Sequence, residues 1–65
     1  MQVQAKPAET LEAGDSVFVI DEHGDEILWT VEVVDVDTVE GIVWVDFDKG
    51  QDTFATGHDV DYIKL

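Results

Sequence analysis

The chain contains no cysteine and no arginine, and it has a single proline, Pro7. Without cysteine it can form neither a disulfide nor a thiolate metal site. His23 and His58 are the only imidazole ligands, which is a poor basis for a structural zinc site. The fold must therefore be held by ordinary apolar packing, for which 45% of the residues are hydrophobic.

Positive charge is almost absent. Three lysines (Lys6, Lys49 and Lys64) stand against 16 Asp and Glu residues, which gives a formal net charge of -13. Small domains usually carry a net charge of magnitude about 2–8. Self-repulsion destabilises such a chain in dilute buffer, and concentrated salt screens most of that repulsion. We expect a halophilic protein adapted to a salt-rich cytoplasm, with cations bound only non-specifically.

Long hydrophobic runs are also missing. None approaches the roughly 20 residues of a membrane-spanning helix, and residues 1–13 lack the apolar core of a secretory signal. An anionic membrane surface would repel the chain. We expect a soluble, cytoplasmic protein with no membrane contact.

Short segments rich in β-branched and aromatic residues predict an all-β fold. The polar residues 1–10 are interpreted as a flexible N-terminal tail, and residues 11–65 as one domain. Strands are expected at 16–20, 27–37, 39–48, 52–55 and 60–65, with a one-turn helix at 56–59 before the last strand. About five short strands in so few residues favour a small, bent antiparallel barrel, in which closure protects the strand edges.

Alternation along the two central segments predicts which side chains face inward. In 39–48, Val43 and Val45 share one face, and Ile42 and Trp44 share the other. The residues expected in the core are Val17, Val19, Trp29, Val31, Val33, Val43, Val45, Phe47, Phe54, Val60 and Ile63.

This order of elements resembles the SH3-like barrel superfold over residues 11–65. The Gly14-Asp15-Ser16-Val17-Phe18-Val19 opening is similar to that of KOW-type barrels, and the stretch 41–45 and the segment 60–63 also match. In composition the chain looks like small uncharacterised haloarchaeal proteins. The resemblance implies a five-stranded barrel, but the superfold hosts peptide binders, RNA binders and structural modules alike. The paired tyrosines of signalling SH3 domains and the basic loops of RNA-binding KOW modules are absent.

Two acidic segments invite a metal-binding interpretation. Asp46, Asp48 and Asp52 lie at alternating positions, but Gly50, Gln51 and Gly57 stand where a calcium loop needs an oxygen ligand, a glycine and a glutamate. His23 lies in the acidic loop 21–26, whose ligands nothing fixes in place. We expect no specific metal and no cofactor.

Catalytic candidates are few. Ser16 is the only serine, and it begins a strand. The interior of so small a barrel is filled by side chains and leaves no pocket in which a pKa could be tuned. We expect no enzymatic activity.

Trp44 is the most informative single residue, because an exposed tryptophan is typical of a binding surface. With Ile42, and with Tyr62 if it joins them, Trp44 would form an aromatic and aliphatic patch. Alternatively, Trp44 covers a second small core packed by the tail or by Leu11. The patch predicts a non-catalytic interaction module that engages a protein partner or itself. The alternative is a KOW-like barrel acting in transcription or translation, although three lysines are few for a nucleic-acid surface.

Overall fold

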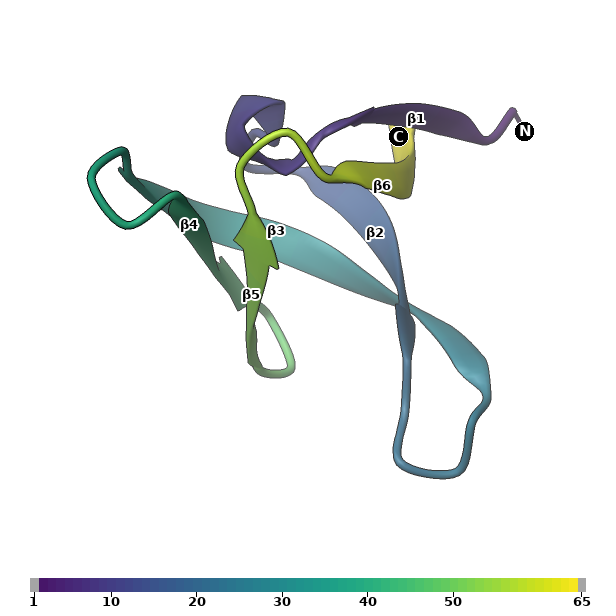
Figure 1. The fold of residues 1–65 in the computed structure, drawn as a ribbon. Helices are drawn as coiled ribbons and strands as arrows, with labels where there is room; N and C mark the ends of the chain where they lie inside the picture. The colour runs from purple at the N-terminus through teal and green to yellow at the C-terminus, as the bar shows by residue number, and fades with distance from the viewer. Residues whose placement is uncertain (1, 65) are drawn as a thin grey trace.

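The computed structural model describes residues 2–64, and of Lys64 only the backbone. Six strands and one short 3-10 helix lie within those residues. They are β1 (Gln4–Pro7), η1 (Ala8–Thr10), β2 (Asp15–Ile20), β3 (Glu26–Asp37), β4 (Ile42–Phe47), β5 (Gln51–Ala55) and β6 (Asp59–Lys64). All paired strands are antiparallel. The prediction of an all-β antiparallel fold is confirmed (Figure 1).

The strands form one sheet in the order β1-β6-β2-β3-β4-β5. The sheet bends strongly, but within residues 2–64 its edge strands β1 and β5 do not pair, so it is an open sheet of six strands instead of a closed barrel of five. The expected helical turn before β6 is also absent. Gly57 has a φ of 81°, in the left-handed region, so the segment between β5 and β6 turns instead of winding into a helix.

The N-terminal segment differs from the expected flexible tail, because residues 4–10 form β1 and η1. Strand β1 adds to the edge of β6, with Gln4 opposite Tyr62. Its end is fastened by hydrogen bonds to the turn before β6. The backbone N–H of Ala8 donates to the carbonyl oxygen of His58 at 2.9 Å, and Glu9 Oε2 accepts from the N–H of Gly57 at 2.8 Å. Ala8 itself is fully buried.

The 12-residue strand β3 connects the two halves of the sheet. It pairs with β2 near its start and with β4 near its end. The register with β4 shifts between Val31, which lies opposite Phe47, and Val33, which lies opposite Asp46. This β-bulge adds one residue to β3 and reverses the alternation beyond it. Val34 therefore packs against the core, and Val33 is 56% exposed. The prediction of Val33 as a core residue is wrong for this reason.

The inner face of the bent sheet holds the core. Its buried members are Ala8, Leu11, Val17, Val19, Val31, Val43, Val45, Phe47, Val60, Tyr62 and Ile63. Eight of these were predicted as core residues (Val17, Val19, Val31, Val43, Val45, Phe47, Val60 and Ile63). Trp29 and Phe54, also predicted, are partly buried and pack against it. Ala8, Leu11 and Tyr62 join the core because β1 pairs with β6 and η1 packs near β3.

Several carboxylates shape the turns by accepting backbone hydrogen bonds. Asp21 Oδ1 accepts from the N–H of His23 at 2.9 Å and from that of Asp25 at 2.8 Å, which closes the β2–β3 loop. Asp37 Oδ1 accepts two N–H groups in the β3–β4 turn, each at 3.0 Å. Asp48 Oδ1 accepts from the N–H of Thr30 at 3.0 Å, across the sheet. Asp is favoured at such positions because its short side chain reaches nearby backbone amides.

Candidate functional site

Two surfaces of the molecule combine exposed apolar side chains with acidic neighbours. The first is the outer face of β3, β4 and β5, which we call the outer β4 face. It consists of Val33, Asp35, Asp37, Ile42, Trp44, Asp46, Gln51, Thr53 and Ala55, as the register of the three strands shows. The second is a hollow over Trp29.

Trp44 lies at the centre of the outer β4 face and is 44% exposed. Its neighbours across the strands are Asp35 on β3 and Thr53 on β5. Ile42, two residues earlier on β4, lies on the same face and is half-buried. The alternation of β4 produces this placement. Val43 and Val45, which alternate with Ile42 and Trp44 along the strand, are fully buried on the other face. Leu11 lies in the main core and does not cover Trp44.

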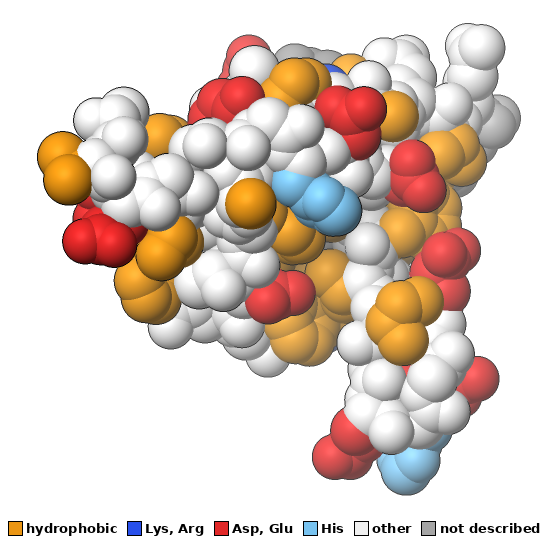
Figure 2. All heavy atoms as spheres, viewed as in Figure 1, with side chains coloured by type: hydrophobic (Ala, Val, Ile, Leu, Met, Phe, Trp, Pro, Cys, Tyr) orange, Lys and Arg blue, Asp and Glu red, His pale blue; other side chains and the backbone are white. Residues whose placement is uncertain are grey.

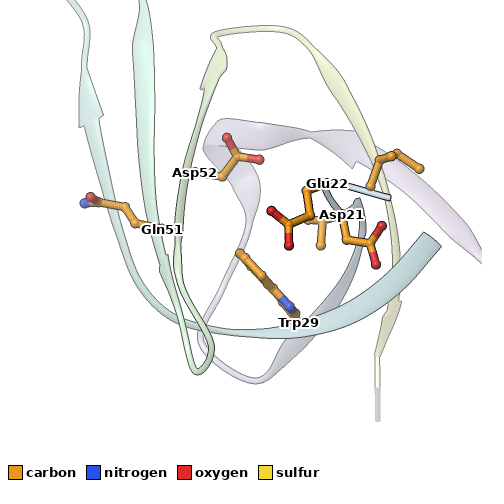
Figure 3. A pocket seen from close by; sticks show the side chains of 7 residues that line it. Asp21, Glu22, Trp29, Gln51 and Asp52 are labelled. Carbon is orange, nitrogen blue, oxygen red and sulfur yellow. The ribbon is translucent and has the colours of Figure 1, made fainter. Parts of the chain in front are cut away.

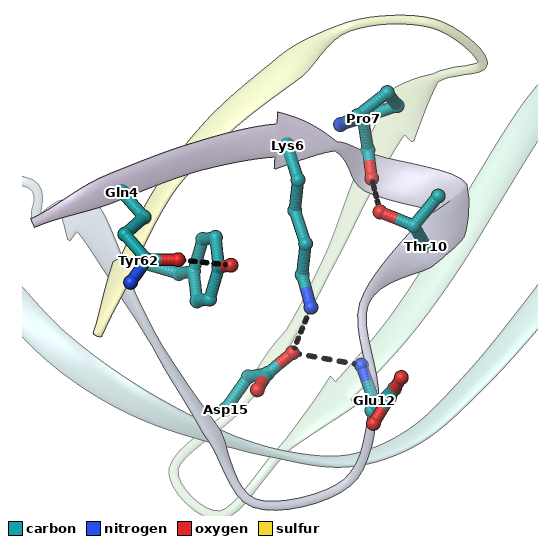
Figure 4. Close-up of polar contacts among 7 residues, drawn as sticks. All are labelled: Gln4, Lys6, Pro7, Thr10, Glu12, Asp15 and Tyr62. Carbon is teal, nitrogen blue, oxygen red and sulfur yellow. Dashed lines mark hydrogen bonds and ion pairs between the residues drawn. The ribbon is translucent and has the colours of Figure 1, made fainter. Parts of the chain in front are cut away.

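Tyr62 does not belong to the outer β4 face. It is 8% exposed and lies on β6, which is separated from β4 by β2 and β3 in the sheet. Its hydroxyl donates to Gln4 Oε1 at 2.8 Å, and Lys6 Nζ lies 4.3 Å from the centre of its ring. Strand β1 therefore covers Tyr62 and takes it out of the predicted patch (Figure 4).

An ion pair between the partly buried Lys6 and the buried Asp15 lies beside Tyr62. Lys6 Nζ is 2.7 Å from Asp15 Oδ2, and the side chain of Asp15 is 0% exposed. The same oxygen accepts from the backbone N–H of Glu12 at 3.0 Å (Figure 4). A backbone contact of this kind is typical of an Asp beside a turn, but nothing in the sequence indicated Lys6 as the partner of Asp15. The pair holds β1 against the start of β2.

The second surface is a hollow of about 450 Å³ between the β2–β3 hairpin and β5, which we call the Trp29 hollow. It is lined by Val19, Ile20, Asp21, Glu22, Trp29, Gln51 and Asp52. Figure 2 shows the hairpin projecting from the body, with hydrophobic side chains in the notch between them. In Figure 3 the indole of Trp29 lies at the base, with Asp21 and Glu22 on one side and Asp52 on the other.

Trp29 is held at the base of the hollow by two contacts. Its ring packs on Phe47 with 5.5 Å between the ring centres. Gly50 lies directly against the indole, since a Cβ added at Gly50 would be 2.7 Å from the indole Cη2. Sequence reasoning placed Trp29 in the core and missed the hollow. No sequence signal could have shown it, because the hollow depends on the sheet remaining open.

The carboxylates that suggested a metal site form other contacts in the structure. Asp46 Oδ1 accepts from Gln51 Nε2 at 2.9 Å, and Asp48 and Asp52 each accept a backbone N–H. His23 is exposed, with Nε2 3.7 Å from Glu22 Oε1. Among residues 2–64, no group of three or more His, Cys, Asp or Glu side chains is close enough to hold a metal ion.

Ser16, the only serine, is 3% exposed. Neither surface brings it beside a histidine, as His23 lies at the tip of the exposed β2–β3 loop and His58 stacks on Phe54. What the two surfaces offer is contact area, an indole each, and acceptor oxygens.

No protein-family model, curated protein or solved structure matches this chain. In the part of the chain that the structure describes, no helix has both the length and the apolar character needed to span a membrane.

Proposed function

We propose that this chain is a non-catalytic interaction module that engages a protein partner through the outer β4 face. The observation that carries the proposal is the exposure of Trp44, at 44%, on a strand that is paired on both sides. A tryptophan on a rigid strand loses little conformational freedom on binding and contributes a large apolar area with a polar N–H.

The surroundings of Trp44 favour a partner of a particular kind. Val33, at 56% exposure, extends the apolar centre, and Asp35, Asp37 and Asp46 surround it on the same face. The matching surface would have an apolar centre and a basic rim, because complementary charge speeds association and excludes wrong partners. A second copy of this chain is a poorer match, since its charge is also -13.

The resemblance to SH3-like barrels belongs to the same proposal, as does the halophilic character. Strand order and bending support a small barrel-like module whose edges have not joined. The excess of carboxylates supports a working environment of concentrated salt, where the partner would be equally acidic overall and basic only at the contact.

A nucleic-acid partner is less well supported. Lys6 is engaged with buried Asp15, and Lys49 is the other lysine whose side chain the structure describes. Neither forms a basic patch, which phosphate binding requires.

The test is a pull-down from a lysate kept at about 1 M KCl, where the chain's repulsion is screened, followed by titration of the purified partner. Trp44→Ala is compared with Val39→Ala, which removes a side chain that is 92% exposed in the β3–β4 turn, outside the outer β4 face. We expect Trp44→Ala to weaken binding by about 30-fold, as at an interface hot spot, and Val39→Ala to leave it unchanged.

Three results would overturn the proposal. Equal binding by wild type and Trp44→Ala would remove the outer β4 face from the contact. A concentration-dependent dimer of the pure protein, lost in Trp44→Ala, would make self-association the role. Binding to RNA that strengthens as salt is lowered, while the circular dichroism spectrum persists, would favour the KOW-like alternative.

A further inference from the structure

The Trp29 hollow lies between two strand edges that have no neighbour. Strand β2 pairs with β6 only at Asp15–Val17, so within residues 2–64 its second half, Phe18–Ile20, pairs with β3 alone. Strand β5 is the last in the sheet and pairs with β4 alone. The hollow is lined by residues of both strands. An additional strand in the hollow would therefore lie between these two edges and close the sheet.

The backbone of β5 presents hydrogen-bonding groups along its outer edge. The N–H of Phe47 donates to the Gly50 carbonyl at 2.7 Å, and the N–H of Thr56 donates to the Gly41 carbonyl at 3.0 Å. Bonding alternates along an antiparallel pair, so Asp52 and Phe54 direct their backbone groups toward β4. The N–H and C=O groups of Gln51, Thr53 and Ala55 then point away from β4. Two of these groups are engaged within the chain, because the N–H of Thr53 donates to Asp52 Oδ1 at 2.8 Å and the C=O of Ala55 accepts from the N–H of His58 at 3.1 Å.

The hollow combines an apolar base with acidic walls. Trp29 forms the base, and Ile20, at 66% exposure, extends it. Asp52 lies opposite the buried Val45, so its side chain is on the inner face, toward the hollow. Asp21 and Glu22 approach from the hairpin (Figure 3). An extended chain presents side chains alternately to two sides, which fits an apolar group over the indole with cations beside it.

We propose that the Trp29 hollow binds an extended, lysine- or arginine-containing segment of a partner protein, which adds to the edge of β5 as a strand. Main-chain hydrogen bonds to both backbone groups of Gln51, to the C=O of Thr53 and to the N–H of Ala55 supply affinity, and the hollow with its three carboxylates selects an apolar side chain flanked by cations. This goes beyond the outer β4 face and is independent of Trp44.

Charge decides between this occupant and a second copy of the chain. A charge that points inward from an edge strand, as Asp52 does, discourages pairing with another edge of the same kind. Two copies would bring Asp21, Glu22 and Asp52 against an equally acidic chain. A basic segment turns the same carboxylates into partners.

The probe is a synthetic capped peptide that alternates lysine with leucine or valine over eight residues, titrated in about 1 M KCl to screen diffuse attraction. Two control peptides are used. One carries N-methyl groups on the amides along one edge, which blocks strand addition, and the other replaces each apolar residue by serine. Binding is followed by NMR as shifts and hydrogen-exchange protection of the backbone amides of Gln51 and Ala55.

The variant Asp52→Lys is expected to weaken peptide binding about tenfold, because it places like charges together. Asp61→Lys makes the same change of charge at an exposed position outside both surfaces and should leave binding within about twofold. Trp44→Ala should bind the peptide as wild type does. The test of the Trp29 hollow is therefore separate from the test of the outer β4 face, and either proposal can fail without the other.

The proposal is overturned if the peptide does not bind, or if it binds without protecting the β5 amides. It is also overturned if the N-methylated peptide binds equally well, or if Asp61→Lys weakens binding as much as Asp52→Lys. Protection of the β5 amides that depends on protein concentration and needs no peptide would assign the edge to a second copy.

Discussion

Lys6 Nζ lies 2.7 Å from Oδ2 of Asp15, whose side chain is completely buried. The contact joins the N-terminal strand to the first residue of β2, and the same ammonium lies 4.3 Å from the centre of the Tyr62 ring. Strand β1 is a short edge strand of four residues. The ion pair therefore adds a contact with β2 to the pairing that holds β1 beside β6.

Lys6→Met is expected to destabilise the protein by about 3–5 kcal/mol, because it leaves a buried carboxylate without its cation. That is comparable with the whole stability of a domain of this size, about 3–10 kcal/mol. Urea unfolding in molar KCl measures the loss. The matched control is Lys49→Met, at an exposed position, which should change stability by less than about 0.5 kcal/mol. Equal effects of the two variants would show that the ion pair does not hold the fold.

Stability is expected to rise as KCl increases from about 0.1 M to 2 M, because screening removes repulsion among the carboxylates. Urea, which is uncharged, reports this through its unfolding midpoint. A triple variant, Glu40→Gln with Asp59→Asn and Asp61→Asn, neutralises three exposed acids and should show a shallower salt dependence. If the midpoint does not move with salt, or the triple variant keeps the full dependence, charge repulsion is not what limits stability.

The β-bulge predicts opposite outcomes for two valines of β3. Val31 is 2% exposed and Val33 is 56% exposed. Val31→Ala should cost about 2 kcal/mol through lost burial and a residual cavity, whereas Val33→Ala should stay within about 0.5 kcal/mol. Parallel urea titrations compare them. Similar losses would mean that β3 alternates without interruption and that the bulge is absent.

Gly50→Ala is expected to displace the indole of Trp29, since the new Cβ would lie 2.7 Å from Cη2 and 2.8 Å from Cζ3. The ring borders an open hollow into which it can move, so the cost should be about 1 kcal/mol, at the low end for overpacking. Fluorescence in a Trp44→Phe background isolates Trp29, and its emission maximum should shift. Val39→Ala, at a position that is 92% exposed in the β3–β4 turn, should leave the emission unchanged. An unmoved spectrum in Gly50→Ala would contradict the contact.

Local patterns made β4 predictable. Its strict alternation places Val43, Val45 and Phe47 inside and Ile42 and Trp44 on the other face, as two-residue periodicity requires. The all-β class followed from the same patterns. These features depend on near neighbours in the chain, which the sequence displays directly.

Features that depend on distant residues were not predictable. Val33 was misplaced because a bulge is set by the register with β4, which the sequence of β3 does not contain. Strand β1 looked like a tail because it forms only by pairing with β6, on the opposite end of the chain. Tyr62 was assigned to the surface for the same reason, and the Trp29 hollow exists only because β2 and β5 do not meet.

The carboxylates that close the turns set a rule for redesign. Redesign for ordinary laboratory buffer would lower the acidity, but truncating Asp21, Asp37 or Asp48 to alanine would remove acceptors that organise the β2–β3 loop, the β3–β4 turn and the contact with Thr30. Asparagine keeps an amide oxygen at the same distance along the side chain. Asn at those three sites would lower the acidity while leaving an oxygen for each backbone N–H.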